Sequence, residues 1–316
     1  MTGPPVATAA VRVAVRRALA DLPATGLVLA AVSGGADSLA LAAALTFERD
    51  RAGALVVDHG LQDGSAAVAA RAAEQCHSLG LAPVEVLTVA DGATATGSGG
   101  PEARARAARY ACLEEAARRL GATAVLLGHS LDDQAETVLL GLARGAGARA
   151  LAGMASVREP FRRPLLDLSR ATTRSACAEA GLQPWEDPHN ADPAYARVRV
   201  RSSVLPVLER ELGPGVAGAL ARSARHLRED ADALDALTPP LPDEPDCAHL
   251  AALPAALRAR ALKRWAERAT GRAVTAAHVD ALRALVEQWA GQGPVDLPGG
   301  LRVRRTAGVL TLRGDT

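Results

Sequence analysis

The chain has 316 residues, of which 49% are hydrophobic and 22% are charged, and its formal net charge is +1. Its length exceeds the usual single-domain size of about 100 to 200 residues, which predicts one large and one smaller domain. No uncharged apolar run approaches the ~20 residues of a membrane span, and Arg12, Arg16 and Asp21 interrupt the first apolar stretch, unlike a secretory signal. We therefore expect a cytoplasmic protein without a membrane partner.

The cysteines and the single lysine limit the kinds of binding site that the chain can form. The four cysteines, Cys76, Cys112, Cys177 and Cys247, are scattered without a C-x-x-C pair. This spacing favours buried small apolar residues over disulfides, zinc sites or iron-sulfur clusters. Lys263 is the only lysine, which argues against a Walker A loop because that loop requires a lysine.

The first half of the chain alternates short apolar runs with longer alanine-rich stretches, a pattern that predicts an α/β domain with a parallel sheet. The predicted strands are 27–32, 54–57, 84–89 and 124–127. The predicted helices are 38–48, 66–79, 102–120 and 132–142. Because such sheets bind ligands outside the carboxyl ends of their strands, we expect the functional site at that edge.

The first strand is followed by "SGGADS", residues 33–38. Glycine permits positive φ and close backbone approach, and the amino end of the helix that follows favours an anion. A tight turn capped by Asp37 or Ser38 is the competing interpretation. The position after the first strand favours a phosphate ligand, held by Ser33, Gly34, Gly35, Ala36, Asp37 and Ser38.

The second strand ends in "VVDHG", which contains Asp58 and His59. An acidic residue at this point often contacts a nucleotide ribose. A lone histidine is more often a structural hydrogen-bonding group than a ligand or base. We predict both residues at the nucleotide site and leave the structural alternative open for His59.

The segment "GHSLDDQAETVLL" begins at Gly128 and carries three carboxylates on one predicted helix. Asp133 lies three residues after Ser130, as in a capping box. Glu136 lies three residues after Asp133 and four after Asp132, so the carboxylates share one side of the helix. Capping does not need Glu136, and the cluster could instead hold Mg²⁺ or accept a cationic substrate amine.

Two arginine groups suit the same cleft. In the helix 102–120, Arg106 and Arg109 lie on the same face, as a charged cleft wall or as an exposed ion-paired surface. Arg197 and Arg201, in "YARVRVR", suit a nucleic acid or a phosphate, although a solvated edge explains them equally.

The remaining segments indicate a flap and a second domain. "DGATATGSGGPEA", residues 91–103, is a long Gly/Thr/Ser loop typical of a mobile flap. Helices are predicted at about 215–237, 254–270 and 275–290, with an acidic, proline-rich linker at 238–247 and strand-like runs near the end. We expect domains at 1–212 and 213–316, the second mainly helical. Its arginine excess after Leu250 suits phosphate contacts or a solvated helix face.

Together these stretches resemble the bacterial tRNA(Ile)-lysidine synthetases, which belong to the N-type ATP pyrophosphatase group. "SGGADS" resembles the S-G-G-x-D-S loop of that family, called the PP-loop, and "VDHGL" resembles its second motif. "EARARAARY" resembles its E-x-x-x-R-x-x-R-Y helix, and "GHSLDDQAETVLLGLARGAG" its most diagnostic block. "RPLLDLSR" and "WEDPHNADPAYARVRVR" continue the resemblance. It implies an adenine nucleotide alpha hydrolase-like domain followed by a tRNA-binding domain.

The resemblance also implies a reaction. ATP adenylates the C2 carbonyl oxygen of the wobble cytidine of tRNA(Ile) with a CAU anticodon, and the ε-amine of free lysine then displaces AMP. The implied ligands and partners are ATP, Mg²⁺, lysine and this tRNA. The implied catalytic residues are Asp37, Asp133, Glu136 and Arg106, with Asp37 near the metal. The implied substrate-binding residues are His129, Asp132, Asp133, Glu136, Arg109, Arg197 and Arg201.

Two alternative functions remain at this point. A PP-loop tRNA thiolase resembles the same loop, but such enzymes generally need paired cysteines, which this sequence does not supply. A nucleotide-binding regulatory protein would keep ATP without chemistry, and the presence of both the carboxylate block and the arginine-tyrosine helix argues against it. The sequence carries no indication of oligomeric state.

Overall fold

In the computed structural model the chain divides into two compact units, Met1–Arg228 and Glu229–Thr316. The structure describes residues 3–58, 60, 64–88, 101–187 and 192–314. His59 and the expected flap, up to residue 100, lie outside these residues. The division falls within one helix, α10 (Val216–Leu237). The domain boundary expected between residues 212 and 213 stays a prediction.

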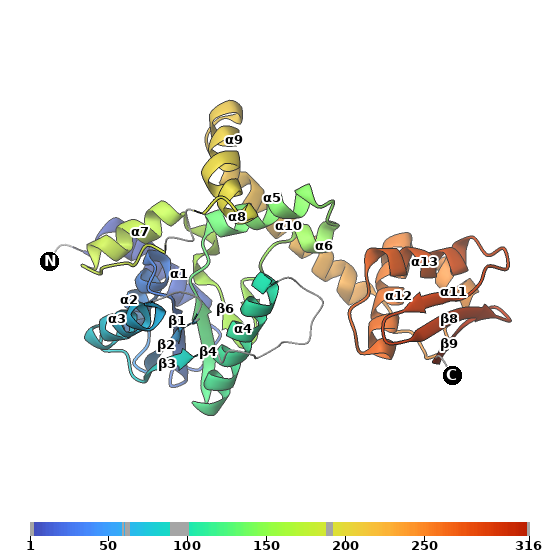
Figure 1. Ribbon diagram of the computed structural model, residues 1–316, viewed down its shortest axis with the longest axis horizontal. Coiled ribbons are helices and arrows are strands. Elements are labelled where there is room, and N and C mark those ends of the chain that lie inside the picture. Colours follow the sequence, from blue (N-terminus) through green and yellow to red (C-terminus); the bar gives the residue numbers. More distant parts are fainter. Residues whose placement is uncertain (1–2, 59, 61–63, 89–100, 188–191, 315–316) are drawn as a thin grey trace. The chain divides into compact units, whose positions relative to one another are not determined.

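The amino-terminal unit is built on a six-stranded sheet with the order β3-β2-β1-β4-β6-β5 (Figure 1). Its strands are β1 (Leu27–Val32), β2 (Ala52–Asp58), β3 (Val84–Thr88), β4 (Ala122–Leu127), β5 (Val157–Arg158) and β6 (Phe161–Arg162). Pairing is parallel except between β5 and β6. The four predicted strands and the parallel sheet are confirmed, whereas the two short strands β5 and β6 were not predicted.

Helices of this unit are α1 (Val6–Ala18), α2 (Ala36–Glu48), α3 (Ser65–Ser78), α4 (Pro101–Arg119), α5 (Leu131–Ala143), α6 (Ala148–Leu151) and α7 (Arg170–Glu179). A 3₁₀ turn (Pro164–Asp167) precedes α7, and α8 (Ala196–Arg199), a π-helical turn (Val200–Val204) and α9 (Leu205–Leu212) follow it. The predicted helices correspond to α2, α3, α4 and α5. The sequence did not predict α1 or α7, which pack against each other and against α2.

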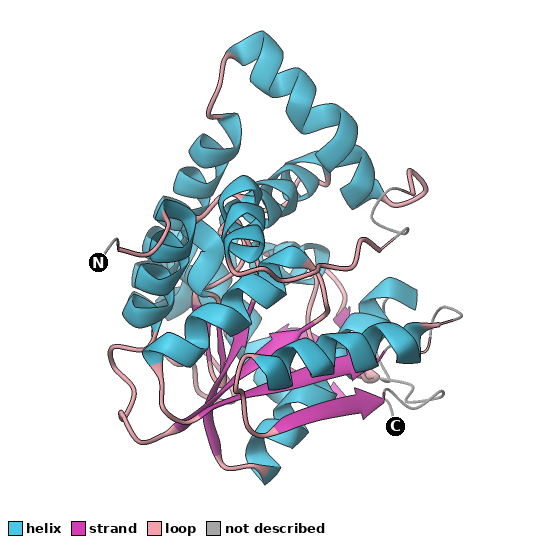
Figure 2. Cartoon of the chain, turned by 90° about the vertical axis from the view of Figure 1, so that its left-hand side faces the viewer, coloured by secondary structure: helices cyan, strands magenta, loops and turns pink. Residues whose placement is uncertain are grey.

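The sheet is covered on both faces, because side chains of a strand point alternately to opposite sides. Val28 and Ala30 belong to one apolar core with buried residues of α1, α2, α3 and α7. Leu27 and Leu29 belong to the other core, with Leu113 of α4. Figure 2 shows helices packed against the strands. The central strands are therefore continuous apolar runs, as their sequence indicates.

The order of the strands fixes where a ligand can bind. From β1 the chain continues to β2 and β3 on one side of the sheet and to β4 on the other. This reversal leaves a crevice at the carboxyl ends of β1 and β4. Gly128 directly follows β4, and a Cβ atom there would lie 3.1 Å from the Cα and N atoms of Ser38. The missing side chain thus lets the turn after β4 lie against the start of α2.

The carboxy-terminal unit holds the end of α10, then α11 (Cys247–Ala252), α12 (Ala255–Thr270) and α13 (Ala276–Glu287). An antiparallel sheet follows, formed by β7 (Val295–Leu297), β8 (Leu301–Thr306) and β9 (Val309–Gly314). Trp265 is fully buried in its core, and its indole N–H donates to the carbonyl of Asp243 at 3.1 Å. The mainly helical character and the strand-like runs near the end are confirmed. No helix in the described ranges is long and apolar enough to cross a membrane.

The contact at Gly128 gives a first prediction. Gly128→Ala adds a methyl group against backbone atoms of α2, so we expect it to lower the free energy of unfolding by about 1–3 kcal/mol. Gly293→Ala is the control, since nothing lies within 4 Å of a Cβ atom there. Urea unfolding followed by circular dichroism measures both variants. Equal midpoints for Gly128→Ala and the wild type would show that the turn adapts without cost.

Candidate active site

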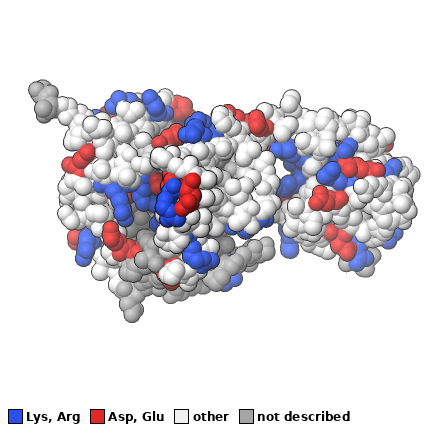
Figure 3. Space-filling view, turned by 90° about the horizontal axis from the view of Figure 1, so that it is seen from above, with Lys and Arg blue, Asp and Glu red and all other residues white. Residues whose placement is uncertain are grey.

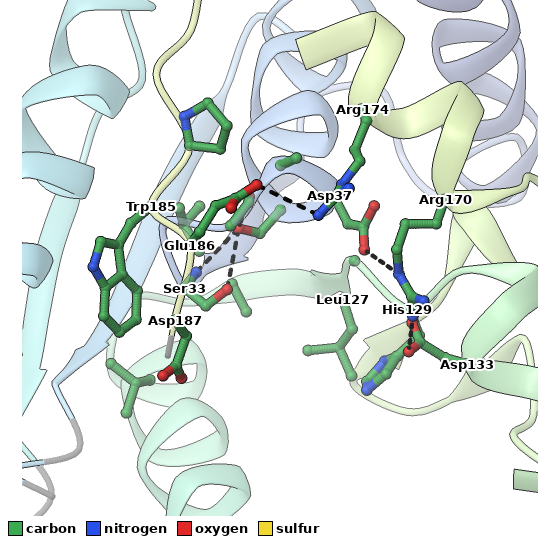
Figure 4. Close-up of a pocket in the computed structure, with 18 of the residues that line it drawn as sticks. Ser33, Asp37, Leu127, His129, Asp133, Arg170, Arg174, Trp185, Glu186 and Asp187 are labelled. Carbon is green, nitrogen blue, oxygen red and sulfur yellow. Dashed lines mark hydrogen bonds and ion pairs between the residues drawn. The ribbon is translucent and has the colours of Figure 1, made fainter. Parts of the chain in front are cut away.

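A cavity of about 910 Å³ opens at the carboxyl ends of β1 and β4 (Figure 4). Residues of the loop after β1, the turn after β4, α4 and α7 line it, together with the segment 184–187. Its volume falls within the range of about 300–1,000 Å³ that is typical of small-molecule sites. The cavity lies at the sheet edge where the sequence predicts the functional site.

The loop after β1 is ordered by its own hydrogen bonds. Gly34 has a φ of +83°, which favours glycine. The hydroxyl of Ser38 donates to the carbonyl of Gly35 at 2.8 Å and accepts the N–H of Ser33 at 3.2 Å. The N–H of Trp185 donates to the carbonyl of Gly34 at 2.9 Å. Ser38 therefore stabilises the turn, while the amino end of α2 remains directed at the cavity that the loop lines.

Asp133 has a structural partner on one oxygen and a cationic partner on the other. Its Oδ2 accepts the backbone N–H and the hydroxyl of Ser130 at 2.8 and 3.0 Å, which confirms the expected capping box. Its Oδ1 accepts from Arg170 at 2.8 Å. Burial opposes the charge of Asp133, but Arg170 and the Ser130 N–H outweigh it and lower the pKa of the carboxyl. Asp133 lines the cavity as an ionised group.

The two neighbouring carboxylates face away from the cavity. Asp132 accepts the backbone N–H of Arg170 at 2.7 Å and so stabilises the start of α7. Glu136 is fully buried. Its oxygens lie 2.7 Å from Nε of Arg201 and 3.4 Å from Nε of Arg197. Asp132 therefore caps α7, and Glu136 balances positive charge within the protein.

Arg170, which the sequence did not predict, is the centre of this cluster. Its guanidinium lies 2.8 Å from Asp133, 3.3 Å from Glu136 and 3.9 Å from Asp37 (Figure 4). Burial opposes its charge, but these carboxylates outweigh burial and raise the pKa of Arg170. The one sequence signal for Arg170 was the "RPLLDLSR" stretch, which continues the family resemblance and ends on this residue. Its four acidic partners come from other parts of the chain.

Asp37 is the carboxylate of the loop itself. Burial raises its pKa, the Thr173 hydroxyl that donates to it lowers the pKa, and the charge of Asp133 raises it again, so that the net shift is upward. A negative charge at Asp37 is therefore costly unless a cation lies nearby. Arg170 is the neighbouring cation in this structure.

The helix α4 supplies a cation without an acidic partner. Arg109 lines the cavity, and within the described ranges no ion pair joins it to a carboxylate. Burial and the positive charges of Arg106 and Arg197 lower the pKa of Arg109. Arg106 instead donates to the Tyr110 hydroxyl at 3.2 Å and lies over its ring. A half-buried cation with no ion-pair partner among the described residues favours an anionic ligand, so Arg109 suits a phosphate.

His129 lines the cavity beside the carboxylates. The pKa of His129 is lowered to about 3, chiefly by burial. The negative charge of Asp133 offsets only part of this shift, and the positive charges of Arg163 and Arg106 add to it. The imidazole is therefore neutral at physiological pH, and its Nδ1 has no hydrogen-bond partner among the described residues.

Asp58 lies at the end of β2 and accepts the N–H of Gly60 at 3.1 Å. Its neighbour Val57 lines the cavity.

The structure thus brings part of the predicted set together. The predicted residues that line the cavity are Ser33, Gly35, Ala36, Asp37, Ser38, Arg109, His129, Asp133 and Arg201. The described residues that were predicted but do not line it are Gly34, Asp58, Arg106, Asp132, Glu136 and Arg197. Lining residues that were not predicted include Arg170, Arg174, Trp185, Glu186 and Asp187. The one sequence signal for the last three was the "WEDPHNADPAYARVRVR" stretch, which begins with them.

The cysteines of the chain are mostly buried, and the described residues contain no grouped set of metal ligands. Cys76, Cys177 and Cys247 are buried as expected, and Cys112 is half-buried. Burial raises the pKa of the Cys76 and Cys177 thiols to about 11. In the part of the chain that the structure describes, no three His, Cys, Asp or Glu side chains are grouped to hold a metal ion.

The arginine excess of the carboxy-terminal unit is largely ion-paired. Arg258 lies 2.8 Å from Glu287, and Arg302 lies 2.8 Å from Asp296. On the face drawn in Figure 3, basic and acidic side chains are interspersed over this unit. Many of these arginines therefore belong to an ion-paired surface, the alternative that the sequence left open.

The sheet order, the glycine loop at the strand reversal and the acidic helix start define a PP-loop nucleotide-binding domain. The family model described as "PP-loop domain" matches residues 8–208, and the one described as "TilS substrate binding domain" matches residues 246–311. In solved structures, the U34-tRNA thiolase NcsA from Methanococcus maripaludis shares the fold, with a TM-score of 0.58 and 19% identity over 71% of this chain and 80% of that chain.

Curated relatives narrow the class to one family. The tRNA(Ile)-lysidine synthase of Thermobifida fusca is 54% identical over 100% of this chain and 100% of its own length. The tRNA(Ile)-lysidine synthase of Salinispora arenicola is 55% identical over 98% of this chain and 96% of its own length. The chain belongs to the tRNA(Ile)-lysidine synthase family.

The lowered pKa of His129 gives a second prediction. Between the ordinary histidine pKa of about 6.5 and the folded value of about 3, the unfolded chain binds a proton that the folded chain does not. The free energy of unfolding therefore falls as pH falls through this window, by up to about 1.4 kcal/mol per pH unit from this group. His129→Gln should make the slope shallower, as measured by urea unfolding at several pH values. Parallel curves for variant and wild type would contradict a neutral buried imidazole.

Proposed function

We propose that the cavity at the ends of β1 and β4 joins free lysine to C2 of the wobble cytidine of tRNA(Ile) with a CAU anticodon. The enzyme is a ligase that forms a carbon–nitrogen bond and uses ATP. The observation that carries the proposal is that one cavity holds a phosphate-type loop, an arginine with no ion-pair partner among the described residues, and an ionised carboxylate. The first two suit ATP, and the third suits the ammonium group of lysine.

The triphosphate binds at the loop after β1. Backbone N–H groups at the amino end of α2 and the helix dipole favour negative charge there. Arg109 reaches the same cavity from α4 and supplies a full positive charge. Arg201 also lines the cavity, and its guanidinium lies 3.6 Å from the carboxylate of Asp133. These groups stabilise charge that develops at the α-phosphate.

Chemistry proceeds in two substitutions. The C2 carbonyl oxygen of the cytidine attacks the α-phosphorus of ATP, and pyrophosphate leaves with the electron pair of the broken phosphorus–oxygen bond. The ε-amine of lysine then attacks C2, and the carbon–oxygen bond to AMP breaks. Adenylation is needed because it turns a poor leaving oxygen into a good one.

Lysine must lose a proton before it attacks, because an ammonium group has no free electron pair. Asp133 attracts the ammonium group and is held ionised by Arg170. Burial in the cavity disfavours the charged form of an amine and so favours its deprotonation. Neutral His129 lies in the same lining and offers a hydrogen-bonding nitrogen.

A Mg²⁺ ion that accompanies the nucleotide would fit beside this loop. Mg²⁺ usually binds one or two carboxylates together with substrate phosphates and water, so a dedicated cluster of protein ligands is not required. Asp37 is the carboxylate of the loop, and its raised pKa indicates that a nearby cation is favourable. When bound there, the ion would offset phosphate charge. We assign Asp37 as its protein ligand.

The tRNA partner and the cellular location complete the proposal. The carboxy-terminal unit matches the TilS substrate binding domain, and we assign tRNA binding to it. A cytoplasmic location agrees with these substrates. The thiolase alternative is not favoured: the solved thiolase carries a [4Fe-4S] cluster, whereas the cysteines here are unpaired and mostly buried.

The direct test supplies ATP, Mg²⁺, lysine and unmodified tRNA(Ile) with a CAU anticodon. We expect the wobble cytidine to gain the mass of one lysine less one water, and AMP to form in equal amount, as measured by nucleoside mass spectrometry and chromatography. Norleucine in place of lysine is the control, because it lacks the ε-amine. A folded protein that releases no AMP and leaves the cytidine mass unchanged would refute the proposed function.

The unpaired cation on α4 gives a separate prediction. Arg109→Gln removes a charge-assisted hydrogen bond worth about 1.5–3 kcal/mol, so we expect the KM for ATP to rise by about 10- to 100-fold. Arg118→Gln, an exposed position on the same helix that pairs with Glu115, is the matched control. Steady-state AMP release measures both variants. An unchanged KM for Arg109→Gln would remove this residue from the phosphate site.

A further inference from the structure

Arg170 touches every carboxylate of the acidic cluster formed by Asp37, Asp132, Asp133 and Glu136. Its guanidinium contacts three of them and its backbone N–H the fourth. The residue is the first of α7, where the Asp132 contact and the Ser169 cap fix its backbone. Its side chain lines the cavity and is 18% exposed. The guanidinium can therefore move while its backbone stays in place.

The carboxylate oxygens of α5 are already occupied by other groups. Oδ2 of Asp133 accepts from Ser130, and its Oδ1 accepts from Arg170 at 2.8 Å. Oε1 of Glu136 lies 2.7 Å from Arg201 and 3.3 Å from Arg170. Its Oε2 lies 3.2 Å from Arg201. A lysine ammonium group that binds these oxygens must therefore compete with the guanidinium groups already there.

Arg170 is the arginine best placed to leave. Arg201 holds both oxygens of Glu136, whereas Arg170 makes one close contact with Asp133 and extends towards the loop carboxylate of Asp37. A triphosphate at that loop offers the guanidinium a new partner, because guanidinium groups bind phosphate oxygens with two parallel hydrogen bonds. Movement towards the loop would remove the nearest donor of Oδ1 of Asp133 and leave Arg201 at 3.6 Å from it.

We infer that Arg170 occupies the cation subsite at Asp133 and that lysine takes its place after the guanidinium moves to the bound nucleotide. Arg170 is thus a positioning residue that makes lysine binding depend on ATP. The inference rests on the proposed function. It differs from a purely structural role, in which Arg170 would only neutralise the cluster and lysine affinity would not depend on nucleotide.

The test measures lysine binding by equilibrium dialysis with radiolabelled lysine, with and without a non-hydrolysable ATP analogue. In the wild type we expect the analogue to increase lysine affinity by about 5- to 150-fold, the usual range of coupling between sites. In Arg170→Gln we expect lysine affinity without nucleotide to rise at least about 10-fold, and the effect of the analogue to fall to about twofold or less.

Two controls separate displacement from a general charge effect. Arg174 lies one helical turn further along α7, lines the same cavity and pairs with Glu186 at 3.6 Å. Arg174→Gln should leave nucleotide-free lysine affinity within about twofold of the wild type, because the cation subsite keeps its guanidinium. Norleucine should show no gain in Arg170→Gln, since it lacks the ε-ammonium group. Ethylguanidinium added to Arg170→Gln should compete with lysine for the vacated position.

The outcomes are separable from those of the proposed function. A wild type that forms lysidine but binds lysine equally well with and without the analogue would overturn the inference alone. So would a folded Arg170→Gln whose nucleotide-free lysine affinity equals that of the wild type. If this variant does not fold, the wild type still tests the coupling, since equal lysine affinity with and without the analogue overturns the inference. Failure of the wild type to form lysidine would refute the function itself.

Discussion

The charge balance between α5 and the arginines of α7, α8 and the turn after it is the interaction on which the site depends. Glu136 is fully buried, and a buried carboxylate is stable only when cations and hydrogen bonds compensate it. Arg201, Arg197 and Arg170 supply that compensation. Arg170 begins α7, whereas Arg197 and Arg201 lie in the short helix α8 and in the π-helical turn after it. The acidic helix therefore determines where those segments pack, and with them one wall of the cavity.

The same balance explains why one cavity can serve reactants of opposite charge. Asp133 is held ionised by Arg170 beside a loop that favours anions. Arg109, without a carboxylate partner in the described part of the chain, adds positive charge on the opposite helix. In the proposed site an anionic nucleotide and a cationic amino acid would thus meet complementary groups, with Arg170 between them. Neutral His129 adds a hydrogen-bonding group without disturbing this balance.

Local patterns predicted the parts of the fold that are set by nearby residues. Strand β1 and the capping box of Ser130 and Asp133 were predicted because apolar runs and short spacings encode them directly. Helix α7 and residue Arg170 were not, because the acidic partners of Arg170 lie 34 or more residues away, as the 37-residue separation from Asp133 illustrates. Spacing placed Glu136 correctly on the side of Asp133, but it could not show that distant arginines surround this carboxylate.

The fold determines where the ligands bind, and the side chains determine which nucleophile is used. The PP-loop fold is shared with a thiolase at only 19% identity, so the fold itself cannot decide which nucleophile is used. What the fold supplies is a crevice where the strand order reverses and a glycine turn that brings β4 against α2. The choice of an amine must then come from groups that attract a cation. In the proposed site that group is the carboxylate of Asp133, which pairs with Arg170 in this structure.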